Sequence, residues 1–473
     1  MSVVSQSRLD ASDYDRSACR IGAVHLGYGA FHCAHQAVYI DAMMQKTGDL
    51  GWGIAAVNLR AAQSQTFKEA AAQKDGYILK SVNHDGVSRF SRIRPHVRFA
   101  DWSENAVAAE ELLALPSVHM VTITVTESGY YLNDTGQLNG EHPVIAQEIA
   151  GGARTSVYGY LAAGLQRRMQ VTGQPITVLC CDNIRQNGKM LKAAMQRYLD
   201  LCGMPDLSAW MADHVTFPCS MVDRITPRAS AALRAEVQAE FGAGETNPVL
   251  AEDFIQWVVE DNFAGPMPAL DKVGVTITPD VDPYEEAKIR ILNGGHTCLT
   301  YLGALAGHAT FDQAMADPVL FDHFWNYETK EVLPALTLKL PFDKFDYLKG
   351  IAQRFQNASI ADSIERIAAD GFAKFPIFIL PTIRGCLEAG TLPLYALRSA
   401  ASWYVFSRRI ADGSLKLSYA EPSWDALLPL LAEGGQSDFA TSPMLWAEVP
   451  EKFEGFAEAL IQQIEEMEAS WPK

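Results

Sequence analysis

The chain has 473 residues, of which 48% are hydrophobic and 20% are charged, and its formal net charge is −17. A chain of this length is too long for one simple core, so we expect two domains. The negative charge disfavours nucleic acid and anionic membranes as partners, because both are polyanions. The first twenty residues lack the apolar core of a signal peptide, and no run of 18 apolar residues follows, so we expect a cytoplasmic protein without a membrane span.

The eight cysteines contain no C-x-x-C pair, and several lie in apolar runs such as VLCC at 178–181. This pattern predicts free, mostly buried thiols in a reducing compartment, and neither a zinc ribbon nor a disulfide framework.

Four short apolar runs in the first half predict strands at Ile21–Leu26, in the stretch that ends near Asn58, at His119–Thr126 and at Ile176–Cys181. Helical patterns lie between them, at Ala30–Gln45, Ser156–Gln170 and Gly188–Leu201. This alternation predicts a mainly parallel sheet covered by helices. The stretch at 74–93 looks like an antiparallel hairpin inserted into that sheet, with Asp85-Gly86 near its turn.

Beyond about Pro283 the chain shows few convincing strands and many helical periodicities, at Pro318–Leu333, Phe375–Glu388, Leu394–Arg408 and Lys452–Met467. Asp317 stands at a capping position, and Pro318 at the first helical position. We therefore expect an α/β protein with a Rossmann-like, mainly parallel sheet domain over residues 1–282. A mostly α-helical domain is expected over residues 283–473.

A glycine pair, Gly27-x-Gly29, follows the first predicted strand. Such a pair lets the backbone approach a pyrophosphate at a helix N-terminus, although the third position of the usual G-x-G-x-x-G fingerprint is His32 here. The acidic residue expected after the second strand is missing. Asn58 could hold a ribose hydroxyl, and Arg60 could pair with a 2′-phosphate or be a surface charge, so NAD and NADP both stay open.

Polar residues follow several apolar runs: Thr126 after the third strand, Asp182 and Asn183 after the fourth, and Asp223 and Arg224 after a short run at 220–222. In open α/β sheets, ligands collect at the carboxyl ends of strands. Asx turns and helix caps use the same residue types, so each one alone is more simply explained by local structure.

The segment Asp282–Thr297 combines apolar residues with a lysine, an asparagine and a histidine that follows two glycines. On an α-helix, Lys288 and His296 are about 80° apart, and Asn293 and His296 are neighbours. Lysine is a poor base at its ordinary pKa of about 10.4, but burial and nearby cations can lower the pKa of a lysine. The segment is either an amphipathic helix with solvated charges or a catalytic segment in which Lys288 takes a hydroxyl proton while asparagine amides stabilise the alkoxide.

Seven motifs occur in the same order as in the polyol-specific long-chain dehydrogenases. They are GxGxFHxAH at 27–35, TESGYYLN at 126–133, CDNIRQNG at 181–188, MVDRITP at 221–227, QWVVEDNF at 256–263, the segment at 284–296, and RIAADGFAKFP at 366–376. The chain thus resembles the mannitol 2-dehydrogenase family, whose relatives include mannonate oxidoreductases, and its wording is most similar to D-arabinitol 4-dehydrogenases.

The resemblance implies a metal-independent enzyme with Lys288 as general base and with Asn183 and Asn293 as holders of the oxyanion. It implies a proton-passage role for Glu285 and polyol contacts from Asp223, His296, Arg366 and Lys374. For the cofactor we expect contacts from Gly27, Gly29, Ala30, Phe31, His32, Asn58, Arg60 and Thr126. Cys33, where many relatives have arginine, and the missing acidic residue near Asn58 are departures from the family pattern.

The leading hypothesis is a polyol dehydrogenase that interconverts an acyclic sugar alcohol and its ketose with NAD, with NADP still open. The alternatives are a hexuronate reductase of the mannonate or altronate type and a non-catalytic dinucleotide-binding sensor. Beyond a small polyol or ketose we expect no nucleic-acid or membrane partner, and either a monomer or a small homo-oligomer.

Overall fold

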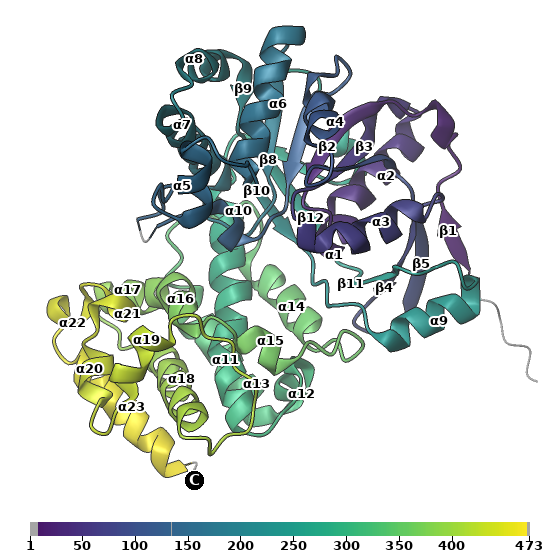
Figure 1. Ribbon diagram of the computed structural model, residues 1–473. Helices are drawn as coiled ribbons and strands as arrows, with labels where there is room; N and C mark the ends of the chain where they lie inside the picture. The colour runs from purple at the N-terminus through teal and green to yellow at the C-terminus, as the bar shows by residue number, and fades with distance from the viewer. Residues whose placement is uncertain (1–7, 134, 471–473) are drawn as a thin grey trace, which may run out of the picture. The chain divides into compact units, whose positions relative to one another are not determined.

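The computed structural model describes residues 8–133 and 135–470. It divides into two compact units (Figure 1). Unit 1 comprises Met1–Asn83 and Val87–Val281, and unit 2 comprises His84–Gly86 and Asp282–Lys473.

Unit 1 is built on a six-stranded sheet in which every neighbouring pair is parallel. Its strands, in spatial order, are β6 (His96–Asp101), β3 (Gly53–Asn58), β2 (Ile21–Leu26), β7 (Met120–Ile123), β8 (Ile176–Cys180) and β9 (Val215–Thr216). Counted along the chain within this sheet, the order is 3-2-1-4-5-6, the doubly wound order of dinucleotide-binding folds. The predicted Rossmann-like parallel sheet is confirmed.

Both faces of this sheet are buried, because alternate residues of each strand point into different cores. In β2, Val24 and Leu26 belong to one hydrophobic cluster and Ala23 to another. The helices of unit 1 are α1 (Ala30–Ala34), α2 (Gln36–Thr47), α3 (Ser64–Ala72), α4 (Ala106–Glu110), α5 (Pro143–Ile149), α6 (Val157–Val171), α7 (Asn187–Leu201), α8 (Pro205–His214) and α9 (Ala231–Phe241). The single helix expected at Ala30–Gln45 is wrong: it is broken at His35, whose backbone is not helical.

Two smaller sheets complete unit 1. One has the order β1 (Leu9–Ala11), β5 (Ser88–Ile93), β4 (Tyr77–Val82), β11 (Val249–Glu252), and the other the order β10 (Ser220–Asp223), β12 (Gln256–Glu260), β13 (Thr276–Thr278). The predicted hairpin exists as the antiparallel pair β4–β5, but its insertion into the parallel sheet is wrong, because its outer edges pair with β11 and β1. The run before Asp223 likewise belongs to a separate sheet and pairs antiparallel with β12.

Unit 2 is helical, and its described residues after Val281 contain no strand. Its helices are α10 (Asp282–Ala287), η7 (Lys288–Asn293), α11 (Gly294–Leu305), α12 (Phe311–Ala316), α13 (Pro318–Asn326), η8 (Tyr327–Val332), α14 (Lys344–Phe355), α15 (Ile364–Ala368), α16 (Gly371–Lys374), η9 (Phe375–Ile379), α17 (Leu380–Glu388), α18 (Leu394–Ala411), α19 (Trp424–Leu427), η10 (Leu428–Leu431), α20 (Gln436–Ala440), α21 (Pro443–Trp446), α22 (Val449–Lys452) and α23 (Phe456–Ser470). Asp317 caps α13 as predicted, because its carboxylate accepts from the backbone N–H groups of Val319 and Leu320.

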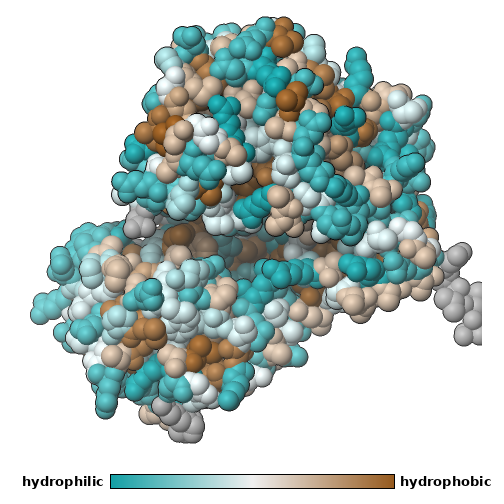
Figure 2. All heavy atoms as spheres, in the orientation of Figure 1, coloured by the Kyte–Doolittle hydropathy of each residue, from teal (hydrophilic) through white to brown (hydrophobic). Residues whose placement is uncertain are grey.

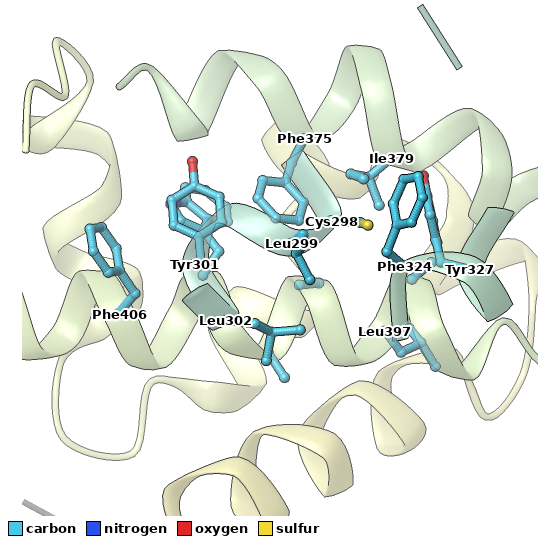
Figure 3. Packing of buried hydrophobic residues seen from close by; sticks show 14 of the residues in the cluster. Cys298, Leu299, Tyr301, Leu302, Phe324, Tyr327, Phe375, Ile379, Leu397 and Phe406 are labelled. Atoms are coloured by element: carbon cyan, nitrogen blue, oxygen red, sulfur yellow. The ribbon is translucent and has the colours of Figure 1, made fainter. Parts of the chain in front are cut away.

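The core of unit 2 forms around α11, which contacts α12, α13, α15 and α18. Its side chains Cys298, Leu299 and Leu302 are buried, and Figure 3 shows them among aromatic rings from neighbouring helices, including those of Phe324 and Phe375. On the face drawn in Figure 2, hydrophilic residues cover most of the surface and hydrophobic ones form small separate patches.

Three helical segments of unit 2 are π-helices: η7, η8 and η9. Each has a hydrogen bond from the residue after it to the carbonyl five residues earlier, as from the Leu333 N–H to the Glu328 carbonyl. The regular α-helices expected at Pro318–Leu333 and Phe375–Glu388 are therefore wrong in part, since each contains one of these segments. The helix expected from Lys452 is also wrong at its start, because α22 ends there and α23 begins at Phe456.

All eight cysteines are free thiols, and six of them are buried, as predicted. Over residues 8–133 and 135–470, no helix combines the length and the apolar character needed to cross a membrane.

Candidate active site

A pocket in unit 1 opens at the carboxyl ends of β2 and β7, where the strand order of the sheet reverses. In open α/β sheets this switch point is where ligands bind. The pocket is lined by Gly27, Tyr28, Gly29, Leu59, Arg60, Gln63, Thr124, Val125, Thr126, Gly129, Tyr131, Thr155, Ser156 and Val157. Gly27, Gly29, Arg60 and Thr126 among the predicted cofactor residues line it.

The backbone at Gly27 requires glycine for two reasons. Its φ is +94°, and a Cβ there would lie 1.9 Å from the carbonyl oxygen of Thr124. The chain therefore turns tightly between β2 and α1, with Gly29 as the residue that precedes the first helical turn. Ser156 caps a second helix, α6, at the same pocket by accepting from the N–H of Gly159. Backbone N–H groups at helix starts suit a pyrophosphate.

Asp182 anchors Val125 and Thr126, two residues that line this pocket. Its carboxylate accepts hydrogen bonds from the backbone N–H groups of Val125 and Thr126 and from the hydroxyl of Tyr130. Thr126 has a φ of +68°, a conformation that non-glycine residues adopt only when their surroundings force it. Burial raises the pKa of Asp182 to about 6, although the hydrogen bond from Tyr130 opposes the shift. Asp182 thus stabilises a strained backbone beside this pocket.

Asn58 and Arg60 differ in the exposure of their side chains. Asn58 is buried, and its amide donates to the Arg60 carbonyl and to Asp101, while its oxygen accepts from the Arg60 N–H. Arg60 is exposed and lines the pocket. Arg60 is therefore the residue of this pair that lines the pocket.

Four predicted cofactor residues do not line this pocket: Ala30, Phe31, His32 and Asn58. Sequence reasoning missed most of the lining from Thr124 to Tyr131 and the segment Thr155–Val157. A signal for the latter exists, because Thr155 directly precedes the predicted helix at Ser156–Gln170, Ser156 begins it, and both are typical capping residues.

In unit 2, Lys288 begins a π-helix rather than continuing α10. On an α-helix Lys288 and Asn293 would be about 140° apart, since each residue turns about 100°. In a π-helix the hydrogen bond joins residues five apart, so these two positions lie closer to one face. The angle of about 80° expected between Lys288 and His296 is therefore wrong. Single π-helical turns occur frequently at functional sites.

The two glycines before His296 allow close packing between η7–α11 and η8. A Cβ on Gly295 would lie 2.9 Å from Oε1 of Glu328 and 2.9 Å from Cε2 of Phe324, and one on Gly294 would lie 3.1 Å from the Tyr327 hydroxyl. Glu328 is fully buried, neither of its carboxylate oxygens has a hydrogen-bond partner, and burial raises its pKa well above the ordinary value. A buried carboxyl group with a raised pKa therefore packs directly on the glycine that precedes His296.

Three cationic side chains lie near the imidazole of His296, which is neutral. Its ring stacks on Phe355 at 4.0 Å and meets Phe311 edge-on at 4.7 Å between ring centroids. Burial lowers the pKa of His296 well below the ordinary value, and Arg366, Arg354 and Lys374 lower it further. The structure thus brings the predicted residues His296, Arg366 and Lys374 together.

Two of the cations near His296, Arg366 and Lys374, are held in place by neighbours of their own side chains: a carboxylate and a backbone carbonyl. Arg366 forms an ion pair with Asp362, and this partner outweighs the opposing effect of burial and raises the pKa of Arg366. Lys374 donates to the carbonyl of Ile367 at 2.7 Å. Arg354 is a residue that sequence reasoning missed. It lies in the last turn of α14, next to the ring that His296 stacks on.

The remaining predicted residues divide between the units. Glu285 and Lys288 are buried in unit 2, 6% and 8% exposed, and Asn293 ends η7. Asn183 is exposed after β8 in unit 1, and Asp223 is the buried last residue of β10. Within the described parts of the chain, no three His, Cys, Asp or Glu side chains are grouped so as to hold a metal ion.

Comparisons with known proteins match both units. Residues 21–272 match the family model of the mannitol dehydrogenase Rossmann domain, and residues 280–467 match that of the mannitol dehydrogenase C-terminal domain. A D-arabinitol 4-dehydrogenase of Ralstonia nicotianae is 37% identical over 446 residues, which cover 93% of this chain and 94% of that protein. A mannitol 2-dehydrogenase of Cereibacter sphaeroides is 36% identical over 88% of this chain and 86% of its own length.

Two solved structures are similar to nearly the whole chain. A Pseudomonas fluorescens mannitol 2-dehydrogenase in ternary complex with NAD and D-mannitol has a TM-score of 0.87 and 31% identity, with 98% of this chain and 94% of that chain covered. A substrate-free D-sorbitol dehydrogenase has a TM-score of 0.88 and 30% identity, with 98% and 96% covered. The chain therefore belongs to the mannitol dehydrogenase family of oxidoreductases.

Proposed function

We propose that this protein is a metal-independent polyol dehydrogenase that oxidises a secondary alcohol of an acyclic sugar alcohol, of the D-arabinitol or mannitol type, to its ketose. NAD takes up the hydride. Family membership over most of the chain supports the reaction class, and the NAD-bound mannitol 2-dehydrogenase supports the cofactor. The glycine turn at the switch point of the sheet is the feature of this chain that suits a dinucleotide.

The observation that carries the proposed chemistry is the π-helical turn from Lys288 to Asn293. In our proposal Lys288 is the general base, which takes the hydroxyl proton as hydride leaves the carbon. The amides of Asn293 and Asn183 stabilise the developing alkoxide. Glu285, one turn before Lys288, passes the proton onward.

The substrate hydroxyls would be bound by Asp223, His296, Arg366 and Lys374. In unit 2 this proposal rests on the cluster around His296, where a neutral imidazole can donate one hydrogen bond and accept another. Arg366 and Lys374 add donors whose positions are set by Asp362 and by the carbonyl of Ile367. Such a cluster suits a polyhydroxylated chain.

The test of Lys288 is the substitution Lys288→Ala, compared with Lys349→Ala as a control on the exposed face of α14. Lys288→Ala should lower kcat for polyol oxidation by more than the roughly 10²–10⁴ that acid–base help alone supplies, because the charge that orients the oxygen is lost too. NADH binding should be unchanged. The oxidation rate of the unaltered enzyme should fall as the pH is lowered, because a protonated lysine cannot accept the hydroxyl proton.

Partial rescue of Lys288→Ala by small external amines would support the assignment. Near-normal turnover in a folded Lys288→Ala protein would show that another group is the base.

A second candidate, a hexuronate reductase, is favoured by the three cations around His296, since an acidic substrate would bind there. A panel of C5 and C6 polyols and of hexuronates, each with NAD and NADP, separates the two. Turnover of hexuronates with none of polyols would replace the leading proposal. No turnover of any substrate would favour a non-catalytic dinucleotide sensor.

A further inference from the structure

The third position of the glycine fingerprint is occupied by a buried histidine. In the usual fingerprint a glycine at this position lets the first helix pack closely on the strand. Here the ring of His32, in α1, lies flat on the ring of His25, in β2, with centroids 3.3 Å apart and planes 10° from parallel. Both side chains are fully buried. Two stacked imidazoles therefore form the contact between strand and helix.

A chain of hydrogen bonds orients His32. The acceptor at its last residue, Gln256, determines which group donates and which accepts at every step. The carbonyl of Gln256 can only accept, so Nε2 of His35 donates to it at 2.8 Å. Nδ1 of His35 then accepts from the amide nitrogen of Gln36, and the amide oxygen of Gln36 accepts from Nδ1 of His32. Nε2 of His32 is left as an acceptor, and Nε2 of His96 donates to it at 2.9 Å.

This chain connects the strands β12 and β6 with the first two helices of unit 1, and it needs neutral imidazoles. Burial lowers the pKa of His32 well below the ordinary value and lowers that of His96 to about 3. His32 is thus held in one tautomer and one ring orientation.

His25 transmits this arrangement to the glycine turn. Its Nε2 lies 3.2 Å from the carbonyl oxygen of Gly27 and 3.0 Å from the hydroxyl oxygen of Thr124. Since a carbonyl only accepts, Nε2 carries the proton, and Nδ1 accepts from the hydroxyl of Thr122 at 2.8 Å. The Thr124 hydroxyl donates to the same Gly27 carbonyl. The carbonyl of Gly27, the positive-φ residue of the turn, therefore accepts from two donors, Nε2 of His25 and the hydroxyl of Thr124.

We propose that His25 and His32 are positioning residues for the dinucleotide: their stacked rings fix the Gly27 turn and the start of α1 against β2, in place of the third glycine. The turn and Thr124 both line the cofactor pocket, so a displaced turn weakens cofactor binding directly. Neither histidine side chain lines that pocket, so both act through the backbone.

The test measures the dissociation constant of NADH by fluorescence titration of the full chain, with three variants. His25→Leu removes the donor to Gly27, and His32→Gly restores the usual fingerprint but removes the stack. Each should raise the dissociation constant at least about tenfold, which corresponds to about 1.4 kcal/mol. His25→Gln keeps an amide donor and should recover most of the affinity.

His214→Leu is the matched control, because His214 ends α8 in the same unit and stacks on Trp210 away from this cluster. It should leave NADH binding unchanged. With an active polyol, His25→Leu should raise KM for NAD and leave kcat at saturating NAD within about threefold, whereas a merely structural role would lower thermal stability at constant NADH affinity. The NADH measurement needs no turnover, so it stands apart from the proposed substrate.

Two results would overturn the proposal. One is NADH affinity within twofold of the unaltered protein in both His25→Leu and His32→Gly, and if His25→Leu does not fold, the same result in His32→Gly alone decides. The other is tighter NADH binding by His32→Gly, which would show that the glycine of the usual fingerprint suits this turn better.

Discussion

Gly295 offers a quantitative test of the packing between the π-helical turns of unit 2. An alanine Cβ there would lie 2.9 Å from both Oε1 of Glu328 and Cε2 of Phe324, and 3.3 Å from Cε2 of Phe355. Overpacking of this kind costs about 1–3 kcal/mol, while alanine in place of glycine inside a helix gains about 1 kcal/mol. Gly295→Ala should therefore be destabilised by up to about 2 kcal/mol.

The control is Gly350→Ala in α14, where a Cβ meets no atom within 4 Å. It should gain about 1 kcal/mol in the free energy of unfolding. The difference between the two variants is then the overpacking cost of about 1–3 kcal/mol. At about 2–4 °C per kcal/mol for a unit of this size, their melting temperatures should differ by about 2–12 °C, measured by calorimetry.

Equal melting temperatures for the two variants would refute this reasoning and show that Glu328 and Phe324 move aside without cost. Because His296 follows Gly295 and stacks on Phe355, Gly295→Ala should also raise KM for the polyol, whereas Gly350→Ala should not.

Three further outcomes are expected. Catalytic efficiency should be higher with NAD than with NADP, and Arg60→Ala should lower it mainly with NADP; an advantage for NADP in the unaltered enzyme would contradict the first expectation. Activity should survive exhaustive chelation, and loss of activity that zinc restores would contradict metal independence. Burial raises the pKa of Asp182 from 3.8 to about 6, so its contribution to stability is present below about pH 4 and is lost as the pH rises through about 6. Urea unfolding should show this loss relative to Asp182→Asn, and a stability difference that does not vary between pH 4 and 7 would contradict it.

Four of the six strands of the parallel sheet, β2, β3, β7 and β8, could be predicted because each is a short, mainly apolar run, as at Ile21–Leu26. The glycine turn after it could be predicted for the same local reason. The break at His35 could not, because its side chain is held by the carbonyl of Gln256, far along the chain.

The π-helical turns escaped prediction because apolar periodicity does not reveal an added residue. The run at Lys288–Asn293 is apolar enough for either kind of helix, and only packing against η8 and η9 distinguishes them. Arg354 had no sequence signal, since it reaches the neighbourhood of His296 from a separate helix. Candidate residues such as Gly27, Asn58 and Lys288 could be singled out from local patterns. Others, such as Glu285 and Arg366, were found only by resemblance to a family, and the roles of all of them stay predictions.

The π-helical turn at Lys288–Asn293 also determines which change of length this helix tolerates. A π turn contains one residue more than an α-helix needs over the same backbone path. Removal of Ile289 would let the helix continue as a regular α-helix, and the residues on either side of the gap would keep about the same relative orientation, because the π turn already absorbs the added residue. Lys288 and Asn293 would then be four residues apart, about 40° around an α-helix, and would still lie on one face. A homologue that lacks one residue in this segment can therefore keep these two side chains in the proposed arrangement.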